Sequence, residues 1–194
     1  MANRRVTQMA PDGTLTVVAD KWDGKRFNQP NDLWIDAKGG IYVTDPIYMT
    51  VKDREIETED LYYIKPESRE VLRVAEGMVR PNGVIGAKDG KTLYVGDHGG
   101  NKTYVFDIQE DGTLANKRVF ADSGSDGMTL DERGNVYLTG GKEVKIFDKN
   151  GVSLPSIPVP DRTTNVTFGG KDRNILFITS PEAVYKIPMR VKGQ

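Results

Sequence analysis

The chain has 194 residues, with 27 basic and 28 acidic side chains, a formal net charge of −1 and no cysteine. This balance provides no basic field for a phosphate backbone, so we expect no nucleic-acid partner. The absence of cysteine excludes disulfides, thiolate metal sites and a cysteine nucleophile. No apolar run approaches the ~20 residues that cross a bilayer, and the N-terminal segment has no signal-peptide pattern. We therefore expect a soluble cytoplasmic protein with no membrane partner.

The chain begins with two short apolar stretches joined by a Pro-Asp-Gly turn, in the segment RRVTQMAPDGTLTVVAD. This segment is similar to KEVKIFDKNGVSLPSIPVPD further along the chain. Alternating short stretches around such a turn are typical of β-hairpins. We therefore expect residues 1–20 to form the outer half of a four-stranded unit.

Four segments then repeat one pattern, in which a polar residue precedes a short strand, a Gly- or Asp-rich turn and a second strand. The segments are PNDLWIDAKGGIYVTD, PNGVIGAKDGKTLYVGD, SDGMTLDERGNVYLTG and TNVTFGGKDRNILFITS. The second strand carries an aromatic residue 11 or 12 positions after the polar one. The polar and aromatic pairs are Asn31 and Tyr42, Asn82 and Tyr94, Asp126 and Tyr137, and Asn165 and Phe177.

Each repeat is followed by a third apolar stretch, and the first three repeats by a fourth. Four short strands per unit, repeating every 40–50 residues, are typical of propeller blades. The sequence predicts an all-β fold, a single β-propeller domain over residues 1–194 with only about four blades. The expected units span residues 1–20 (a half blade), 30–77, 81–122, 125–161 and 164–190.

A ring of about four blades with open ends exposes unpaired strand edges, which favour association. Three explanations remain open at this point. The chain is a portion of a larger propeller, its edges pair in a homo-oligomer, or its blades close in an unusual way.

Equivalent positions of propeller blades converge on the central channel. Asn31, Asn82 and Asp126 occupy one such position in successive blades. All three offer hard oxygen ligands, which suit Ca²⁺, Mg²⁺ or Mn²⁺ and are less natural for Zn²⁺. The alternative is that these residues only shape the turns around them. Their common register with the aromatic residues favours a divalent metal site.

Other side chains near the expected channel are candidates for substrate contacts. Arg26 and Asn31 lie at the expected channel mouth. Tyr48 follows the Asp45-Pro46 turn and could form part of a lid together with the loop over residues 49–60. The acidic run at residues 52–60 is expected to be a solvated loop, with gating as the alternative.

Three further residues have two interpretations each. Asp32 either caps a turn or faces the channel, and Asn165 is either structural or lines the channel. His98 has no Ser or Cys context for a catalytic triad, so it is either a solvated loop residue or a contact at the channel mouth.

The segments RFNQPNDLWIDAKGGIYVTDP, RPNGVIGAKDGKTLYVGD, SDGMTLDERGNVYLTG and TTNVTFGGKDRNILFITS together resemble the gluconolactonase/regucalcin family of six-bladed propellers. The resemblance runs essentially from end to end and implies that about a blade and a half is missing at the N-terminus. It implies that Asn82 and Asp126 bind one divalent metal ion, with Ca²⁺ as the first choice. It also implies that Asn31 reaches this ion through water or contacts the substrate.

The family completes its metal site with a glutamate in a Glu-Gly-Pro context. No glutamate precedes Glu55 in this chain, and none lies in that context.

The expected function is metal-dependent hydrolysis of a sugar lactone, with the metal polarising the carbonyl and Asp126 as ligand and general base. Arg26, Asn31 and Tyr48 would bind the substrate. One alternative is a non-catalytic propeller fragment or binding scaffold. Another is a phosphotriesterase-type hydrolase, because a metal polarises P=O as readily as C=O.

Overall fold

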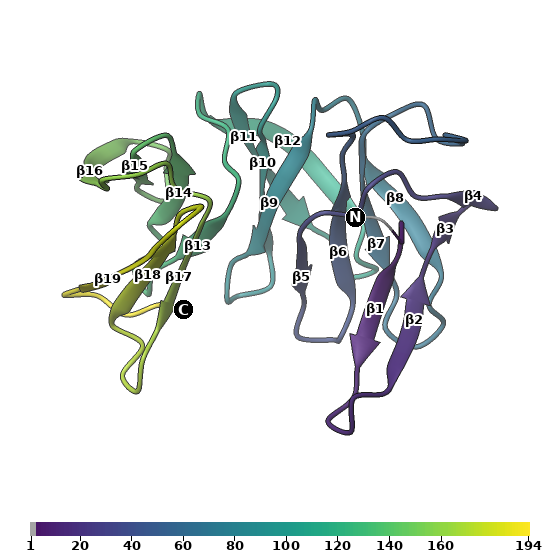
Figure 1. The fold of residues 1–194 in the computed structure, drawn as a ribbon, viewed down its shortest axis with the longest axis horizontal. Helices are drawn as coiled ribbons and strands as arrows, with labels where there is room; N and C mark the ends of the chain where they lie inside the picture. The colour runs from purple at the N-terminus through teal and green to yellow at the C-terminus, as the bar shows by residue number, and fades with distance from the viewer. Residues whose placement is uncertain (1–2) are drawn as a thin grey trace.

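The computed structural model describes residues 3–194, which form antiparallel β-sheets that follow one another in chain order (Figure 1). The first two sheets are short hairpins and contain β1 (Val6–Met9), β2 (Leu15–Ala19), β3 (Lys21–Trp22) and β4 (Lys25–Arg26). The next sheet contains four strands, β5 (Leu33–Ile35), β6 (Ile41–Asp45), β7 (Asp60–Ile64) and β8 (Val71–Ala75).

Two more four-stranded sheets and one three-stranded sheet complete the described chain. One contains β9 (Pro81–Gly86), β10 (Thr92–Asp97), β11 (Lys102–Ile108) and β12 (Leu114–Ala121). The next contains β13 (Met128–Leu130), β14 (Val136–Gly140), β15 (Glu143–Phe147) and β16 (Ser153–Pro158). The last contains β17 (Asn165–Gly169), β18 (Ile175–Thr179) and β19 (Val184–Pro188).

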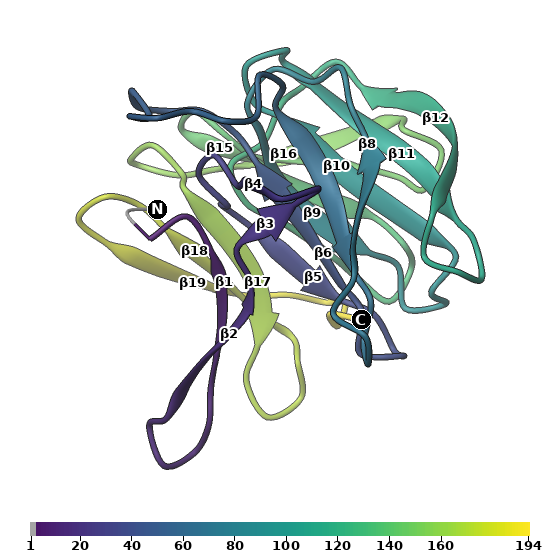
Figure 2. The same cartoon turned by 90° about the vertical axis from the view of Figure 1, so that its right-hand side faces the viewer.

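Neighbouring sheets contact one another through their first strands, in the order β5, β9, β13 and β17. Within each sheet, every strand pairs with the next strand of the chain. A meander sheet whose first strand lies innermost is the blade of a propeller. The all-β propeller fold predicted from the sequence is therefore confirmed. In Figures 1 and 2 the loop between β6 and β7 lies at the top, and the β1–β2 turn lies at the bottom.

The aromatic residues of the repeat pack between sheets. Tyr42 is fully buried, and its hydroxyl donates a 2.8 Å hydrogen bond to the Gly112 carbonyl of the next blade. Tyr137 meets Phe168 of the next blade edge-on, with ring centroids 5.2 Å apart. Large rings fill the wedge between blades, and the Tyr42 hydroxyl also satisfies a backbone acceptor there. This packing explains why the aromatic position repeats in the sequence.

Glycines after the polar residues allow the first strands to approach closely. A Cβ atom on Gly83 would lie 2.8 Å from the Asp126 carbonyl oxygen, and one on Gly127 would meet the Asn165 side chain. Real Cβ atoms do not approach backbone this closely, so these positions accept only glycine without displacement of a neighbour. The Pro-Asn-Gly and Ser-Asp-Gly motifs therefore bring the polar residues of adjacent blades together.

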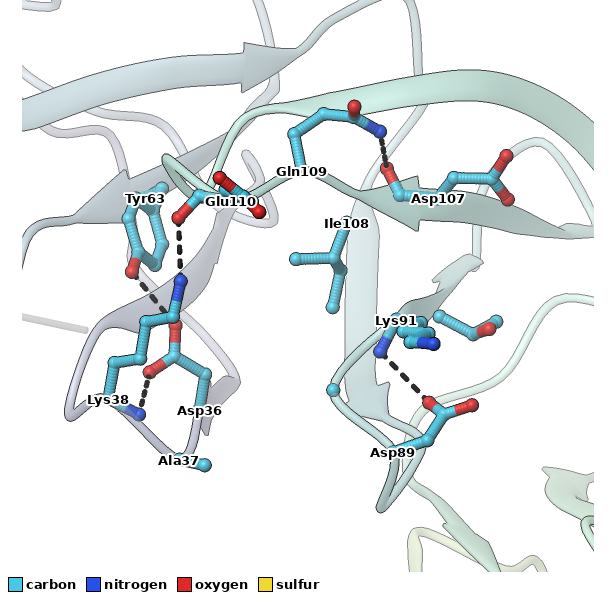
Figure 3. A pocket seen from close by; sticks show the side chains of 13 residues that line it. Asp36, Ala37, Lys38, Tyr63, Asp89, Lys91, Asp107, Ile108, Gln109 and Glu110 are labelled. Carbon is cyan, nitrogen blue, oxygen red and sulfur yellow. Dashed lines mark hydrogen bonds between the residues drawn. The ribbon is translucent and has the colours of Figure 1, made fainter.

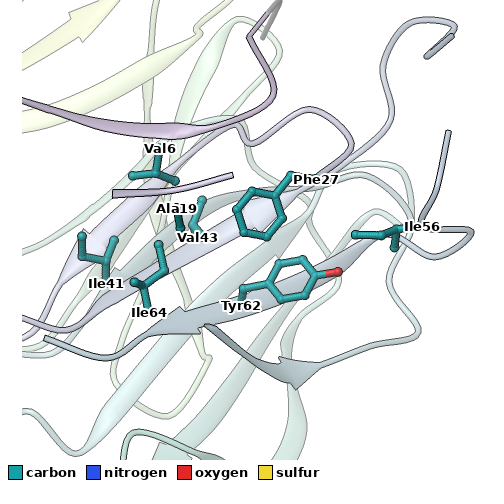
Figure 4. Close-up of a cluster of buried hydrophobic side chains, with 8 residues drawn as sticks. All are labelled: Val6, Ala19, Phe27, Ile41, Val43, Ile56, Tyr62 and Ile64. Atoms are coloured by element: carbon teal, nitrogen blue, oxygen red, sulfur yellow. The ribbon is translucent and has the colours of Figure 1, made fainter. Parts of the chain in front are cut away.

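The β1–β2 hairpin packs on the outer side of the β5–β8 sheet around one buried cluster (Figure 4). The members of this cluster are Val6, Ala19, Phe27, Ile41, Val43, Ile56, Tyr62 and Ile64. Ile56 belongs to the acidic run at residues 52–60, and Asp60 in the same run is fully buried. The prediction that this run is solvated is therefore wrong at these two positions, because Ile56 packs into the core and Asp60 begins β7.

The C-terminal residues cross back under three blades. The Glu132 amide donates to the Lys192 carbonyl at 2.7 Å, and the Lys88 amide donates to the Gln194 side chain at 2.7 Å. The tail therefore connects the last sheet with the turn between β9 and β10.

The described chain exposes 10,500 Å² of surface for a mass of 21.5 kDa. A closed monomer of this mass exposes about 9,200 Å². The extra surface is consistent with a row of blades that has two free ends. Between Asn3 and Gln194 the fold contains no helix that is long and apolar enough to cross a membrane.

Replacement of Leu93, which is fully buried between the β5–β8 and β9–β12 sheets, tests this packing. We expect Leu93→Ala to lower the free energy of unfolding by about 2–5 kcal/mol, because it leaves a cavity. Urea unfolding monitored by circular dichroism measures the change. Val119→Ala, at a position that is 51% exposed in the same sheet, is the control and should change stability by about 0.5 kcal/mol or less. Equal effects of the two variants would contradict this account of the core.

Candidate functional site

Asn82 is the central residue of the candidate site and lies at the beginning of β9, with only 5% of its surface exposed. Its Nδ2 donates to the Tyr48 hydroxyl at 2.7 Å and to Asp126 Oδ1 at 2.9 Å. An amide nitrogen has two hydrogens, and both are used here. The amide orientation is therefore determined by its neighbours, and within residues 3–194 no group donates a hydrogen bond to its Oδ1.

Asp126 precedes β13 and is half-buried beside Asn82. Its Oδ1 accepts the hydrogen bond from Asn82, whereas its Oδ2 has no hydrogen-bond partner within residues 3–194. One amide oxygen and one carboxylate oxygen thus lie on neighbouring first strands. Both are hard ligands of the kind that Ca²⁺ and Mg²⁺ prefer.

Thr44 connects the Asn31 position to this pair. The Asn31 amide donates to the Thr44 carbonyl at 2.9 Å, and the Thr44 hydroxyl donates to the Asn82 carbonyl at 2.8 Å. Asn31 itself is exposed, and its side chain makes no hydrogen bond in the described part of the chain. The structure therefore places Asn31 next to Asn82 along the row of blades. The side-chain amide of Asn31 is available to a ligand.

The neighbours of these residues bind adjacent strands together. The Asp32 carboxylate accepts hydrogen bonds from the Leu33 amide at 2.9 Å and from the Val84 amide of the next blade at 3.1 Å. Burial raises the pKa of Asp32, and the negative charge of Asp126 raises it further. Asp32 therefore caps its own turn and also connects two blades.

Asn165 continues the row in the last blade. Its Oδ1 accepts a 2.7 Å hydrogen bond from the Val166 amide, and its side chain lies against Gly127. These contacts are structural, which agrees with the first of its two interpretations.

Histidine, Asp and Glu side chains form no cluster of three that could hold a metal ion within residues 3–194. A metal site here would depend on the amide oxygens of Asn31 and Asn82 as well as on Asp126.

The loop over residues 46–59 is held above Asn82 by two side chains that the sequence pattern did not identify. Gln29 Oε1 accepts from the Tyr48 and Met49 amides at 2.7 and 3.1 Å. Glu59 Oε2 accepts from the Ile47 and Arg80 amides at 2.7 and 3.1 Å. These bonds position the Tyr48 ring so that its hydroxyl reaches Asn82.

Burial raises the pKa of Tyr48 to about 12, although the hydrogen bond from Asn82 acts in the opposite direction. The phenol therefore keeps its proton at neutral pH. Because the oxygen already accepts from Asn82, the hydroxyl hydrogen is available for donation to a bound molecule.

Asp45 anchors the segment that leads into Asn31. Its two carboxylate oxygens accept from the Asn28 and Gln29 amides, each at 2.7 Å. Burial raises the pKa of Asp45 to about 7, against the effect of these two hydrogen bonds, and the nearby Asp60 charge raises it further. Asp45 is thus a buried anchor whose charge depends on pH near neutrality.

Arg26 and His98 lie at the edge of this site. Arg26 is exposed on β4, where its amide donates to Glu55 Oε2 at 2.9 Å, and its side chain makes no hydrogen bond to Asn82 or Asp126. The structure therefore does not bring Arg26 into contact with the pair, and its substrate-binding role stays a prediction. The exposed His98 ring lies 6.4 Å from the Tyr48 ring, centroid to centroid, which favours its interpretation as a channel-mouth residue.

A cleft of about 350 Å³ opens beside Asp126, between the second and third four-stranded sheets. A larger hollow of about 700 Å³ lies at the opposite ends of the strands (Figure 3). There, Asp36 accepts from the Tyr63 hydroxyl at 2.8 Å, and Lys38 donates to the Glu110 carbonyl at 2.7 Å. The cleft beside Asp126 is the better candidate for ligand binding, because Asp126 lines it and its Oδ2 has no hydrogen-bond partner within residues 3–194.

The model of the SMP-30/gluconolactonase/LRE-like region matches residues 1–182, so the chain belongs to this family. The gluconolactonase of Zymomonas mobilis is 29% identical over 202 residues, which cover 92% of this chain and 55% of that protein. The regucalcin of Xenopus laevis is 26% identical over 181 residues, covering 87% of this chain and 60% of that protein. The chain thus spans about half the length of the curated relatives it matches.

Solved structures of the family have the same fold. A gluconolactonase from Xanthomonas campestris superposes with a TM-score of 0.88 at 30% identity, covering 96% of this chain and 65% of that chain. A calcium-binding protein, regucalcin, from Agrobacterium tumefaciens gives 0.80 at 21% identity, covering 99% and 72%. The family resemblance predicted from the sequence motifs is confirmed.

The raised pKa of Asp45 predicts an unusual pH dependence of stability. The folded chain keeps this proton up to about pH 7, whereas the unfolded chain releases it near pH 4. The contribution of Asp45 to the free energy of unfolding therefore falls as pH rises between these values. Asp45→Asn cannot ionise, so its stability relative to wild type should rise by about 2 kcal/mol from pH 5 to pH 8.

Urea unfolding of both proteins at the two pH values checks this prediction. Asp172→Asn, at an exposed turn, is the control and should show no such change. A stability difference between Asp45→Asn and wild type that is the same at both pH values would contradict the prediction.

Proposed function

We propose that this chain hydrolyses sugar lactones, using a divalent cation held by Asn82, Asp126 and Asn31. The observation that carries the proposal is the pair of hydrogen bonds from Asn82 Nδ2 to Tyr48 and Asp126. Within the described residues, these bonds leave Asn82 Oδ1 and Asp126 Oδ2 without a hydrogen-bond partner, at the inner ends of neighbouring blades. Family membership supports the same activity, because curated relatives include gluconolactonases and lactonohydrolases.

The donor set fits a hard cation, with Ca²⁺ as the first choice and Mg²⁺, Mn²⁺ and Zn²⁺ as alternatives. When bound, such a cation supplies electrophilic polarisation of the lactone carbonyl. The free oxygens of Asn82 and Asp126 are the first ligands, and the exposed Asn31 amide adds a third.

In the proposed reaction, the residues of the chain position the substrate and move one proton. The Asp126 carboxylate accepts a proton from the attacking water as the new C–O bond forms. The ring C–O bond then breaks, and the ring oxygen takes up the proton held by Asp126 to give the open hydroxy acid. The Tyr48 hydroxyl and the Asn31 and Arg26 side chains orient the sugar hydroxyls.

Hydrolysis of glucono-δ-lactone by the purified chain, followed by pH-stat with added Ca²⁺, Mn²⁺, Mg²⁺ or Zn²⁺ and with chelator, tests the proposal. We expect chelator-sensitive turnover that falls by about 100-fold or more in Asp126→Ala, because the base and a ligand are lost together. Asp122→Ala, which removes an exposed carboxylate close by in the chain, should keep wild-type activity. Full metal-dependent turnover by Asp126→Ala would disprove the assigned role.

We expect Tyr48 to raise the affinity for the cation indirectly, through its hydrogen bond with Asn82. Tyr48→Phe removes the hydroxyl that accepts one of the two amide hydrogens, so the Asn82 amide is less firmly oriented. Loss of such an outer partner typically lowers metal affinity by about 10–100-fold. Calorimetric titration of the chain with Ca²⁺ measures the effect. Tyr104→Phe, at a ring that packs under Lys117 in an outer strand, is the matched control and should bind Ca²⁺ like wild type.

A second candidate function is a non-catalytic binding scaffold. It is favoured by the sparse carboxylate set of the site, because His, Asp and Glu side chains form no cluster of three that could hold a metal ion within residues 3–194. A folded chain that binds Ca²⁺ but hydrolyses no lactone would support this candidate against the first.

A further inference from the structure

The cleft beside Asp126 has a basic wall. Its lining includes Lys145 from β15, Arg162 from the segment between β16 and β17, and His98 from the segment after β10. Asp126 belongs to the same lining, so the basic wall and the candidate catalytic carboxylate share one space of about 350 Å³.

The Lys145 ammonium is held in place without being neutralised. Its stem passes over Gly140, where a Cβ atom would lie 3.1 Å from Lys145 Cε. Its Nζ donates to the Ser123 hydroxyl at 3.2 Å, and Ser123 is buried. An ammonium has three hydrogens, so this neutral acceptor leaves donors free.

The two acidic residues of the cleft accept hydrogen bonds from uncharged partners. Glu143 accepts a 2.6 Å hydrogen bond from the Ser156 hydroxyl, and Asp126 accepts from Asn82. In the described chain, the basic partners of ion pairs within 4.0 Å are Arg54, Lys65, Arg73 and Arg118. Within residues 3–194, Lys145 and Arg162 therefore have no carboxylate partner, and both line the cleft that also contains Asp126.

We propose that this cleft is a subsite for an anionic oxygen group, a carboxylate or a phosphate, which the substrate carries away from its lactone carbonyl. Lys145 is the principal contact, and Arg162 supports it from the rim. The inference rests on the proposed lactone hydrolysis and narrows its substrate class to anionic sugar lactones. Charge-assisted hydrogen bonds from an ammonium and a guanidinium are the usual means of holding such groups.

Paired substrates test the subsite. We would measure kcat/KM for 6-phosphoglucono-δ-lactone, glucaro-1,4-lactone and neutral glucono-δ-lactone with wild type, Lys145→Met and Lys145→Met/Arg162→Gln. The wild type should prefer at least one anionic lactone. The ratio of anionic to neutral kcat/KM should fall about 10-fold in the single variant and further in the double variant, as expected for lost hydrogen bonds to a charged group.

Comparison of kcat/KM for the two anionic substrates shows whether the subsite prefers a phosphate or a carboxylate. Lys149→Met, which removes an exposed lysine at the β15–β16 turn, is the matched control and should keep the wild-type ratio. A purely structural role of Lys145 would lower all three rates together and leave the ratio unchanged, and that result would overturn the proposal.

A separate binding measurement keeps the subsite testable if the chain hydrolyses no lactone. Calorimetric titration with 6-phosphogluconate and with gluconate compares two acids that differ only in the phosphate. Tighter binding of 6-phosphogluconate that weakens about 10-fold in Lys145→Met would support the subsite while the hydrolase proposal fails. If neither turnover nor binding depends on Lys145, the subsite is wrong, whatever the outcome for the lactonase activity.

Discussion

The orientation of the Asn82 amide is the constraint on which the rest of the site depends. Asn82 lies almost fully buried between Tyr48 and Asp126 and gives one hydrogen to each. A reversed amide would place its oxygen against a carboxylate, which a buried site does not tolerate. The loop over residues 46–59, the first strand of one blade and the carboxylate of the next are therefore joined through a single nitrogen. The position of this loop and the packing of the two blades are consequently coupled in this protein.

Buried polar side chains also hold the chain behind the loop over residues 46–59. Asp45 and Asp60 face each other across β6 and β7 and are both fully buried. Arg4, also buried, donates to the Phe27 carbonyl and to the Arg26 carbonyl, and Arg73 lies 3.7 Å from Asp60. Replacing Arg4 or Asp45 would leave buried backbone groups without their hydrogen-bond partners, so these contacts favour one arrangement of the segment before Asn31. The polar segment before Asn31 is thus part of the interior and does not simply connect two sheets.

The repeat in the sequence predicted the blades and the polar row because both are periodic. Asn82 and Asp126 follow from the phase of the repeat, and Gly83 and Gly127 follow from the need for close approach. The partners of Tyr48 could not be predicted in this way. Gln29 is 19 residues from Tyr48, and Asn82 is 34 residues from it, and neither pairing has a local signal.

The same limit applies to two other regions. Ile56 is one apolar residue in a charged run, and only the tertiary contacts show that it enters the core. Lys145 alternates with buried residues along β15, so its pattern is that of an ordinary surface lysine. Its hydrogen bond to Ser123, 22 residues away and just after the preceding sheet, has no signal in the local periodicity.

The contact between Lys88 and Gln194 has a consequence for the order in which the chain folds. Each blade is a local meander, and pairing of strands that are adjacent in the chain closes only short loops. The Lys88–Gln194 contact joins residues 106 positions apart, so its formation requires a much longer loop to close. The blades therefore form first, and the segment after β19 fastens sheets that are already ordered.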